Sequence, residues 1–128
     1  MNFLLDTHVL LWAAGQPGKL SRKTRGLLEN PDNTLVYSAV SLWEIVIKQG
    51  IGRDDFQVDA RQLRRGLLDN GYSELAVTSA HALAVDELPK LHRDPFDRML
   101  LAQSRVEGIV LLTADKTMLR YPGALQKA

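Results

Sequence analysis

Short apolar runs alternate along this chain with longer segments in which apolar and polar residues are interleaved. Continuously apolar runs are typical of strands buried on both faces, and they predict strands at residues 2–5, 34–37, 72–77 and 109–112. The interleaved segments predict helices at residues 9–13, 22–29, 42–49, 59–68, 79–88 and 95–107, with a short last helix after Asp115. This alternation predicts an α/β fold with a mostly parallel sheet covered by helices on both faces.

The composition is typical of one globular domain. The 128 residues suffice for one core, so we expect a single domain spanning 1–128. A net charge of +1 gives no global field, so any charged site must come from local clustering. The chain has no cysteine, which excludes disulfides and thiolate metal sites. Asp6 and His8 interrupt the N-terminal apolar run, so we expect no signal peptide, no membrane span and a cytoplasmic location.

Acidic residues recur beyond the predicted strands. Asp6 follows the first strand, Glu44 lies in the first turns of the helix after the second, and Asp115 follows the last clear strand. Ligands of parallel sheets bind beyond the carboxyl ends of the strands, so we expect these acids at one edge. Asp97 joins them if its helix starts there, and the preceding Asp94-Pro95 is typical of an N-cap and a first-turn proline.

Each acid also has a purely structural explanation. Asp6 and Asp115 are suited to cap helices, Ser41-Leu42-Trp43-Glu44 fits a capping box, and Asp97 would complement a helix dipole. The repeated placement at one edge is what favours a functional interpretation. Carboxylates about 4 Å apart repel by roughly 4 kcal/mol at an effective dielectric near 20, so a cluster needs protons or a cation. Mg²⁺ or Mn²⁺ is the natural match and would support phosphodiester hydrolysis.

Four segments resemble those of the PIN-domain ribonucleases, and specifically the VapC-type toxins of bacterial toxin–antitoxin pairs. These segments are Leu4-Leu5-Asp6-Thr7-His8, Ser41-Leu42-Trp43-Glu44-Ile45, the run from His92 to Gln103, and Leu112-Thr113-Ala114-Asp115. The first and last are weak alone, whereas the long third segment is specific, and the resemblance covers essentially the whole chain. It implies a three-layer α/β/α sandwich around a mostly parallel sheet of about five strands.

The resemblance also implies the chemistry of the site. The acidic quartet of the family falls on Asp6, Glu44, Asp97 and Asp115, which would bind Mg²⁺ or Mn²⁺ and cleave single-stranded or loop RNA. Asp6 and Asp97 would be direct metal ligands, and Asp115 would complete the metal site, often through water. Glu44 would position or deprotonate the attacking water. Thr113 would support the site by hydrogen bonding, or would simply cap the last helix.

Family members usually form homodimers and are silenced by an antitoxin whose C-terminal segment lies in a groove beside the active site. We expect that groove near the helix at 59–68 and the helix from Ser21. The RNA substrate (tRNA, rRNA or mRNA) requires positive charge, and Lys48, Arg53, Arg93 and Lys116 are among the candidates. Arg98, beside Asp97, would either pair with an acid or reach a phosphate. The chain's three histidines, His8, His81 and His92, are not expected to take part in the chemistry.

Two other functions remain open from the sequence. A PIN-like module that binds RNA without cutting it would keep the same fold. A phosphoacceptor receiver domain is also α/β and of similar length, but it normally carries an acidic pair after its first strand. That pair is absent here, because Asp6 stands between Leu5 and Thr7.

Overall fold

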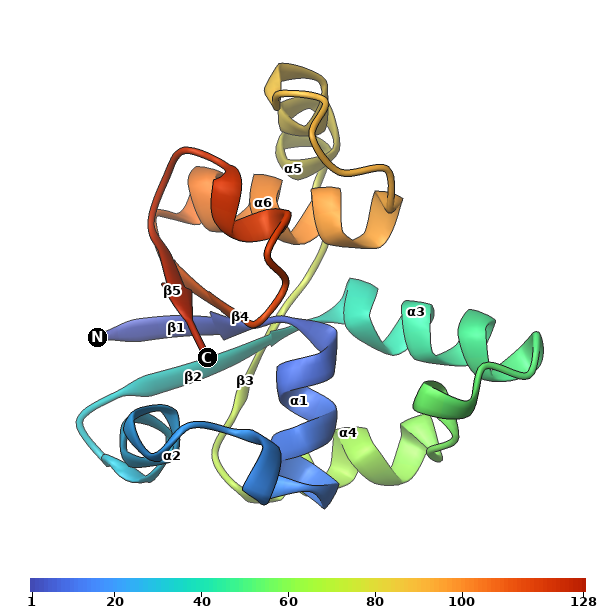
Figure 1. Cartoon of the computed structure of the whole chain (residues 1–128), viewed down its shortest axis with the longest axis vertical. Helices are drawn as coiled ribbons and strands as arrows, with labels where there is room; N and C mark the ends of the chain where they lie inside the picture. The colour runs from blue at the N-terminus through green and yellow to red at the C-terminus, as the bar shows by residue number, and fades with distance from the viewer.

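The computed structural model describes residues 1–128 and contains one five-stranded, all-parallel sheet with the strand order β3-β2-β1-β4-β5 (Figure 1). The strands are β1 (Asn2–Leu5), β2 (Thr34–Ser38), β3 (Ser73–Leu75), β4 (Val110–Thr113) and β5 (Leu125–Lys127). The predicted α/β class and the expected number of strands are confirmed. The third strand is shorter than predicted, and β5 lies where the sequence pattern predicted no strand.

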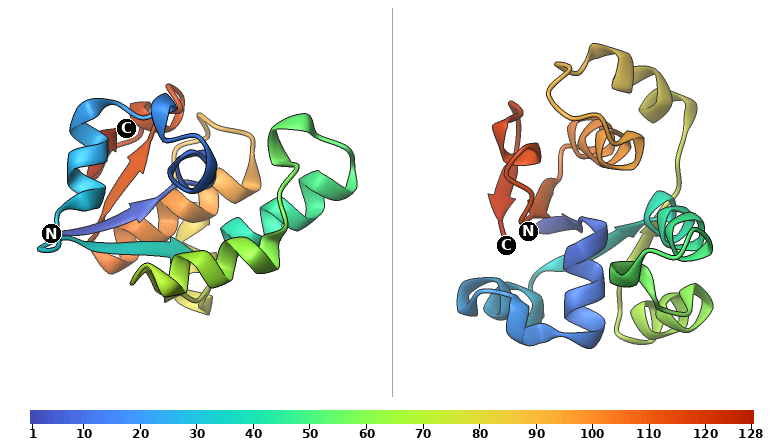
Figure 2. Two further views of the ribbon diagram at one scale, coloured as in Figure 1. Left: turned by 90° about the horizontal axis from the view of Figure 1, so that it is seen from below. Right: turned by 45° about the vertical axis from the view of Figure 1, so that its right-hand side comes forward.

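Helices cover both faces of this sheet (Figure 2). They are α1 (Thr7–Gly15), α2 (Arg22–Glu29), α3 (Ala39–Gly50), α4 (Ala60–Asp69), α5 (Ser79–Ala84) and α6 (Pro95–Glu107). Four single 3₁₀ turns lie between the helices and strands: η1 (Pro17–Lys19), η2 (Asp54–Phe56), η3 (Val85–Glu87) and η4 (Met118–Arg120). The predicted short last helix is therefore only the turn η4. No helix combines the length and the apolarity that crossing a membrane requires.

Two hydrophobic cores lie on opposite sides of β1. Phe3 and Leu5 pack into the core formed with α1, α3 and α4, while Leu4 packs into the core formed with α6. Successive side chains of a strand point to opposite faces, so a strand buried on both faces needs an unbroken apolar sequence. This is why Phe3-Leu4-Leu5 is continuously apolar, and it confirms the three-layer arrangement.

The register of the central strands brings their carboxyl ends to one level. Leu5 pairs with Leu112 across β1 and β4, and the N–H of Asp6 donates to the carbonyl of Leu112 at 3.0 Å. On the other side of β1, Leu4 pairs with Val36 of β2. Asp6, Ser38 and Thr113 therefore come at nearly the same height of the sheet.

Helix α3 begins earlier than predicted, and this changes the position of Glu44. Its N-cap is Ser38, whose hydroxyl accepts from the N–H of Val40 at 3.1 Å. Ser41 consequently lies within the helix and caps nothing, so the capping-box explanation for Glu44 is wrong. Glu44 instead stands in the second turn and is 2% exposed. A carboxylate buried there requires partners other than the helix end.

Candidate active site

The structure brings all four predicted acids to one cavity of about 380 Å³ at the carboxyl edge of the sheet. Asp6 comes from the end of β1, Glu44 from α3, Asp97 from the first turn of α6 and Asp115 from the segment after β4. The cavity is also lined by Asp94 and by the basic or ionisable side chains of His8, Lys48, Arg53 and His92. The prediction that acids from separate strand ends meet at one edge of the sheet is therefore confirmed. Asp97 also reaches that edge.

Asp6 is both a helix cap and a buried member of this cavity. Its Oδ1 accepts from the N–H of Val9 at 2.8 Å, and its Oδ2 accepts from the hydroxyl of Thr113. The side chain is 4% exposed, and this burial raises the pKa of Asp6 despite the two hydrogen bonds. The predicted capping role of Asp6 is therefore confirmed, and its carboxylate also lies in the cavity.

Asp97 is strongly affected by its surroundings in the site. Asp94 caps α6 by accepting from the N–H groups of Phe96 and Asp97 at 2.8 and 3.3 Å, which confirms the predicted Asp-Pro helix start. Burial, with the negative charges of Asp94 and Glu44 acting in the same direction, raises the pKa of Asp97 to about 8. The cavity thus holds more negative charge than its own cations balance.

Lys48 balances part of this charge from within the site. Its Nζ lies 2.6 Å from Oε2 of Glu44 and 2.9 Å from Oδ2 of Asp94. The other oxygen of Glu44 accepts from the hydroxyl of Thr7, which also lies 2.9 Å from the hydroxyl of Ser41. Lys48 was a candidate for RNA contact, and its place four residues after Glu44 was the signal for this pairing.

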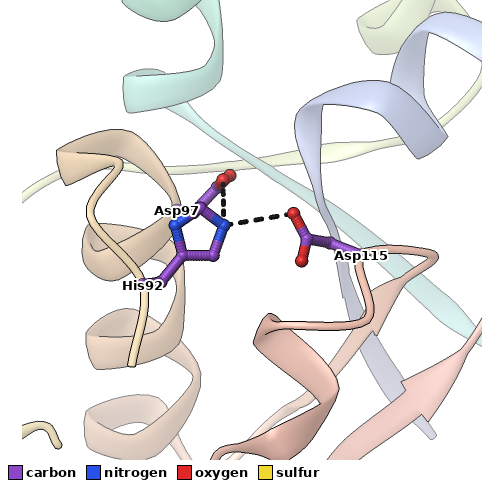
Figure 3. A group of neighbouring side chains, drawn as sticks. All are labelled: His92, Asp97 and Asp115. Atoms are coloured by element: carbon purple, nitrogen blue, oxygen red, sulfur yellow. Dashed lines mark hydrogen bonds and ion pairs between the residues drawn. The ribbon is translucent and has the colours of Figure 1, made fainter. Parts of the chain in front are cut away.

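His92 is the site residue that the sequence interpretation missed. Its Nε2 lies 3.1 Å from Oδ2 of Asp97 and 3.1 Å from Oδ2 of Asp115 (Figure 3). Although burial acts in the opposite direction, the hydrogen bond to His92 lowers the pKa of Asp115. The available signal was that His92 lies two residues before the capping Asp94 and so enters the site with the start of α6.

The two residues expected to support the site differ in position. Thr113 is fully buried, and its hydroxyl donates to Asp6 and accepts from the N–H of Asp115 at 3.0 Å. Arg98 contacts neither an acid nor the cavity. Its guanidinium donates to the carbonyl oxygens of Val85 and Pro89, at 3.1 Å each. Arg98 therefore holds the segment before α6, and the expected pairing with an acid is wrong.

His8 lies at the rim of the cavity and has a partner outside the acidic group. Its Nε2 is 3.1 Å from Oδ2 of Asp55, and its ring packs against those of Trp12 and Phe56. These contacts agree with the structural role expected from the sequence.

The donor atoms suit a hard divalent cation. Asp97 is shared by two groups whose ligand atoms lie within 4.8 Å of one another, one with His92 and Asp115 and one with Glu44 and Asp94. Carboxylate oxygens are the ligands that Mg²⁺ and Mn²⁺ prefer. Because Lys48 already engages Glu44 and Asp94, the acids without a cationic partner are Asp6 and Asp97, with Asp115 beside them.

Three solved structures similar to this chain share its fold. A chain of VapBC2 from Rickettsia felis, bound to a promoter DNA fragment, has a TM-score of 0.75 at 18% identity, covering 100% of this chain and 99% of that one. DNA-bound VapBC from Salmonella typhimurium has a TM-score of 0.69 at 15% identity, covering 99% of this chain and 98% of that one. VapBC-1 from nontypeable Haemophilus influenzae gives 0.63 at 18% identity, also covering 99% and 98%.

Sequence comparison assigns the family. No curated protein sequence matches the chain. The family model described as the PIN domain matches residues 3–124, which include all four acids of the quartet and nearly the whole sheet. This chain belongs to the PIN-domain family.

Proposed function

We propose that this protein is a metal-dependent endoribonuclease and the VapC-type toxin of a toxin–antitoxin pair. The observation that carries the proposal is Asp97, whose pKa is raised to about 8 at the centre of a cavity lined by four further carboxylates. Such a site favours a divalent cation, because the cation replaces the protons that the carboxylates otherwise retain. The PIN family and the structural likeness to VapBC chains support the same function.

The proposed roles follow from the partners of each acid. Asp6, Asp97 and Asp115 would hold Mg²⁺ or Mn²⁺, with Asp6 and Asp97 as direct ligands. When bound, such an ion polarises a phosphoryl oxygen and lowers the pKa of a water molecule. Glu44 would orient the attacking water. Both of its oxygens already accept hydrogen bonds, from Thr7 and Lys48, which favours positioning over proton abstraction.

The RNA backbone would approach from the open side of the cavity. Arg53 lines that side, and Arg93 and Lys116 are exposed beside His92 and Asp115 in the sequence. Positive charge around an acidic centre is needed to bring a phosphodiester close to it. We therefore propose single-stranded or loop RNA, such as segments of tRNA, rRNA or mRNA, as the substrate.

An antitoxin is the proposed protein partner. A second hollow of about 1260 Å³ lies between α1, α2 and α4, where the sequence resemblance places the groove. It is lined by Leu28, Leu63 and Leu67 together with charged side chains, and it includes His8 and Trp12, which also line the acidic cavity. A bound segment would thus reach the acids directly, by groove recognition with charge complementarity.

A homodimer is proposed through the outer face of α3. Trp43, Val46 and Ile47 are exposed on this helix at 60%, 57% and 38%, and Ile51 at its C-cap is 73% exposed. Their spacing of three and four residues places them along one stripe. An exposed apolar stripe of this kind is typical of a surface that a second chain covers.

Cleavage of total cellular RNA by the purified chain, freed of any partner, tests the proposal. The reaction is run with Mn²⁺, with Mg²⁺ and with EDTA, beside the variant Asp6→Asn as a control for contaminating nuclease. We expect cutting that requires the metal and disappears in the variant. RNA that binds and stays intact, with a folded and metal-loaded chain, would instead identify a non-cleaving RNA-binding module.

A further inference from the structure

The imidazole of His92 has one of its nitrogens fixed by the start of α6. Nδ1 lies 3.1 Å from the backbone nitrogen of Asp94, which donates its N–H to the ring. A ring nitrogen that accepts a hydrogen bond carries no hydrogen of its own. The hydrogen of the neutral ring is therefore on Nε2, which makes Nε2 a donor.

The Nε2–H donates to one acid of the quartet, Asp115, and a second acid, Asp97, lies beside this hydrogen bond. Nε2 is 3.1 Å from Oδ2 of Asp97 and from Oδ2 of Asp115, and these carboxylates come from α6 and from the end of β4 (Figure 3). The side chain of His92 is 15% exposed, so the N–H is directed into the cavity and away from bulk water. One ring is thus hydrogen-bonded to one acid and lies within 3.1 Å of a second acid from a different element.

The backbone of His92 is held as firmly as its ring. Its N–H donates to the hydroxyl of Tyr121 at 2.7 Å, and the N–H of Leu91 donates to the same oxygen at 3.1 Å. Tyr121 itself is only 4% exposed. From the other side, Arg98 donates to the carbonyl of His92 at 3.4 Å. The backbone that carries the ring is therefore fixed from both sides, and the ring itself is bonded through both of its nitrogens.

We propose that His92 is a positioning residue whose Nε2–H holds the Asp115 carboxylate in place beside Asp97 for the cation, and that it is not itself a ligand. The proposal rests on the function proposed above for its divalent ion. To ligate, Nε2 would have to give up its hydrogen, and the ring would carry it on Nδ1. That hydrogen would then face the N–H of Asp94 across 3.1 Å, and two donors do not bond to each other.

Nuclear magnetic resonance of the ¹⁵N-histidine-labelled chain tests the tautomer directly. Two-bond nitrogen–proton correlation spectra are recorded for the free chain and for the chain saturated with Mg²⁺. We expect the Nε2–H tautomer of His92 in both states. An Nδ1–H tautomer in the free chain, or a change to it on adding Mg²⁺, would overturn the proposal.

Metal titrations of variants give a second readout. Imidazole ligands favour Ni²⁺ strongly over Mn²⁺, so the loss of a ligand lowers the affinity for Ni²⁺ far more. We expect His92→Ala to lower the affinity for both ions by about tenfold, because groups that orient metal ligands typically contribute 10–100-fold to metal affinity. A loss confined to Ni²⁺ would identify a ligand and contradict the proposal.

Two further variants control the titrations. His92→Gln retains an N–H donor and is expected to recover part of the lost affinity for both ions. Lys23→Gln, at an exposed position of α2 outside the cavity, is expected to bind both ions like the parent. A chain that binds Mn²⁺ as expected but leaves RNA intact would refute the proposed nuclease and leave the role of His92 standing. RNA cleavage by a chain whose His92 carries its hydrogen on Nδ1 would support the proposed nuclease and refute the proposed role of His92.

Discussion

The Nζ atom of Lys48 lies 2.6 Å from Oε2 of Glu44, one turn earlier on α3, and also 2.9 Å from Oδ2 of Asp94. Burial opposes the charged ammonium, yet the hydrogen bonds to these two acids raise the pKa of Lys48 overall. The single positive charge of Lys48 thus lies against two of the five carboxylates in the cavity. The remaining three, Asp6, Asp97 and Asp115, are the ones assigned above to the divalent ion.

Replacement of this ammonium tests the charge balance. We expect Lys48→Met to lower the free energy of unfolding by about 3 kcal/mol without metal, because removing one partner leaves a buried carboxylate uncompensated. We also expect Mg²⁺ to restore more stability to this variant than to the parent, since the ion can then engage Glu44 as well. Urea unfolding with Mg²⁺ and with EDTA measures both effects.

Lys23→Met is the matched control for this measurement. Lys23 is exposed on α2 and has no ion-pair partner, so its replacement is expected to change stability by less than about 0.5 kcal/mol. Equal effects of the two substitutions would show that Lys48 contributes nothing beyond an ordinary surface lysine.

Arg98 is expected to act through the segment that carries His92. Its guanidinium donates to the carbonyls of Val85, Pro89 and His92 in a fork that a lysine ammonium does not reproduce. We expect Arg98→Lys to reduce RNA cleavage about tenfold and to accelerate amide hydrogen exchange at residues 85–92. Unchanged exchange there would contradict a role in holding the segment, whatever the effect on cleavage.

The positions of Asp6 and Asp97 could be predicted because each of them is fixed by a local signal. The continuous apolar run before Asp6 indicates a buried parallel strand, and Asp94-Pro95 indicates where α6 begins. Both signals act within a few residues of the acid concerned. The rule that ligands bind beyond the carboxyl ends of parallel strands then brings distant acids together without further information.

Other features depend on contacts that a local pattern does not contain. The ring of His92 meets Asp115 across 23 residues, and this meeting requires the fold of the segment between them. Strand β5 is only three residues long and exists through its pairing with Leu111 and Leu112 of β4. The start of α3 was misplaced because Ser38 and Ser41 both suit an N-cap, and only the end of β2 decides between them.

The hydroxyl of Thr113 is expected to couple Asp6 to Asp115. It donates to the Asp6 carboxylate and accepts from the N–H of Asp115. We expect Thr113→Val, which keeps the shape and removes the hydroxyl, to lower the free energy of unfolding by about 1–3 kcal/mol. We also expect it to weaken Mn²⁺ binding by at least tenfold, as measured by calorimetric titration.

Thr113→Ser provides the control for this change. It restores the hydroxyl at the cost of one methyl group, which contributes about 0.8 kcal/mol when buried. Mn²⁺ affinity is therefore expected to return while part of the stability stays lost. If Thr113→Val binds Mn²⁺ like the parent, the hydroxyl merely caps the turn after β4.

The raised pKa of Asp97 predicts a pH dependence of stability with a definite sign. In the folded chain without metal, the surroundings raise the pKa of this carboxyl to about 8 from 3.8, the ordinary value of an aspartate that has no such neighbours. The folded state therefore binds more protons than the unfolded state between about pH 4 and 8, and its stability falls as the pH rises through this range. The raised pKa of Asp6 acts in the same direction.

We expect the free energy of unfolding in EDTA to fall by an amount on the order of 3 kcal/mol between pH 5 and pH 8.5. Mg²⁺ should flatten this dependence, because it competes with the proton for Asp97, and its affinity should rise over the same range. Asp97→Asn should flatten the pH dependence of stability without metal and should abolish RNA cleavage. The variant should keep the fold, which circular dichroism would show. The difference in stability between the parent and Asp97→Asn is the quantity to measure. A difference that stays constant with pH would mean that Asp97 is already ionised in the folded chain, and the excess of negative charge inferred for the cavity would be wrong.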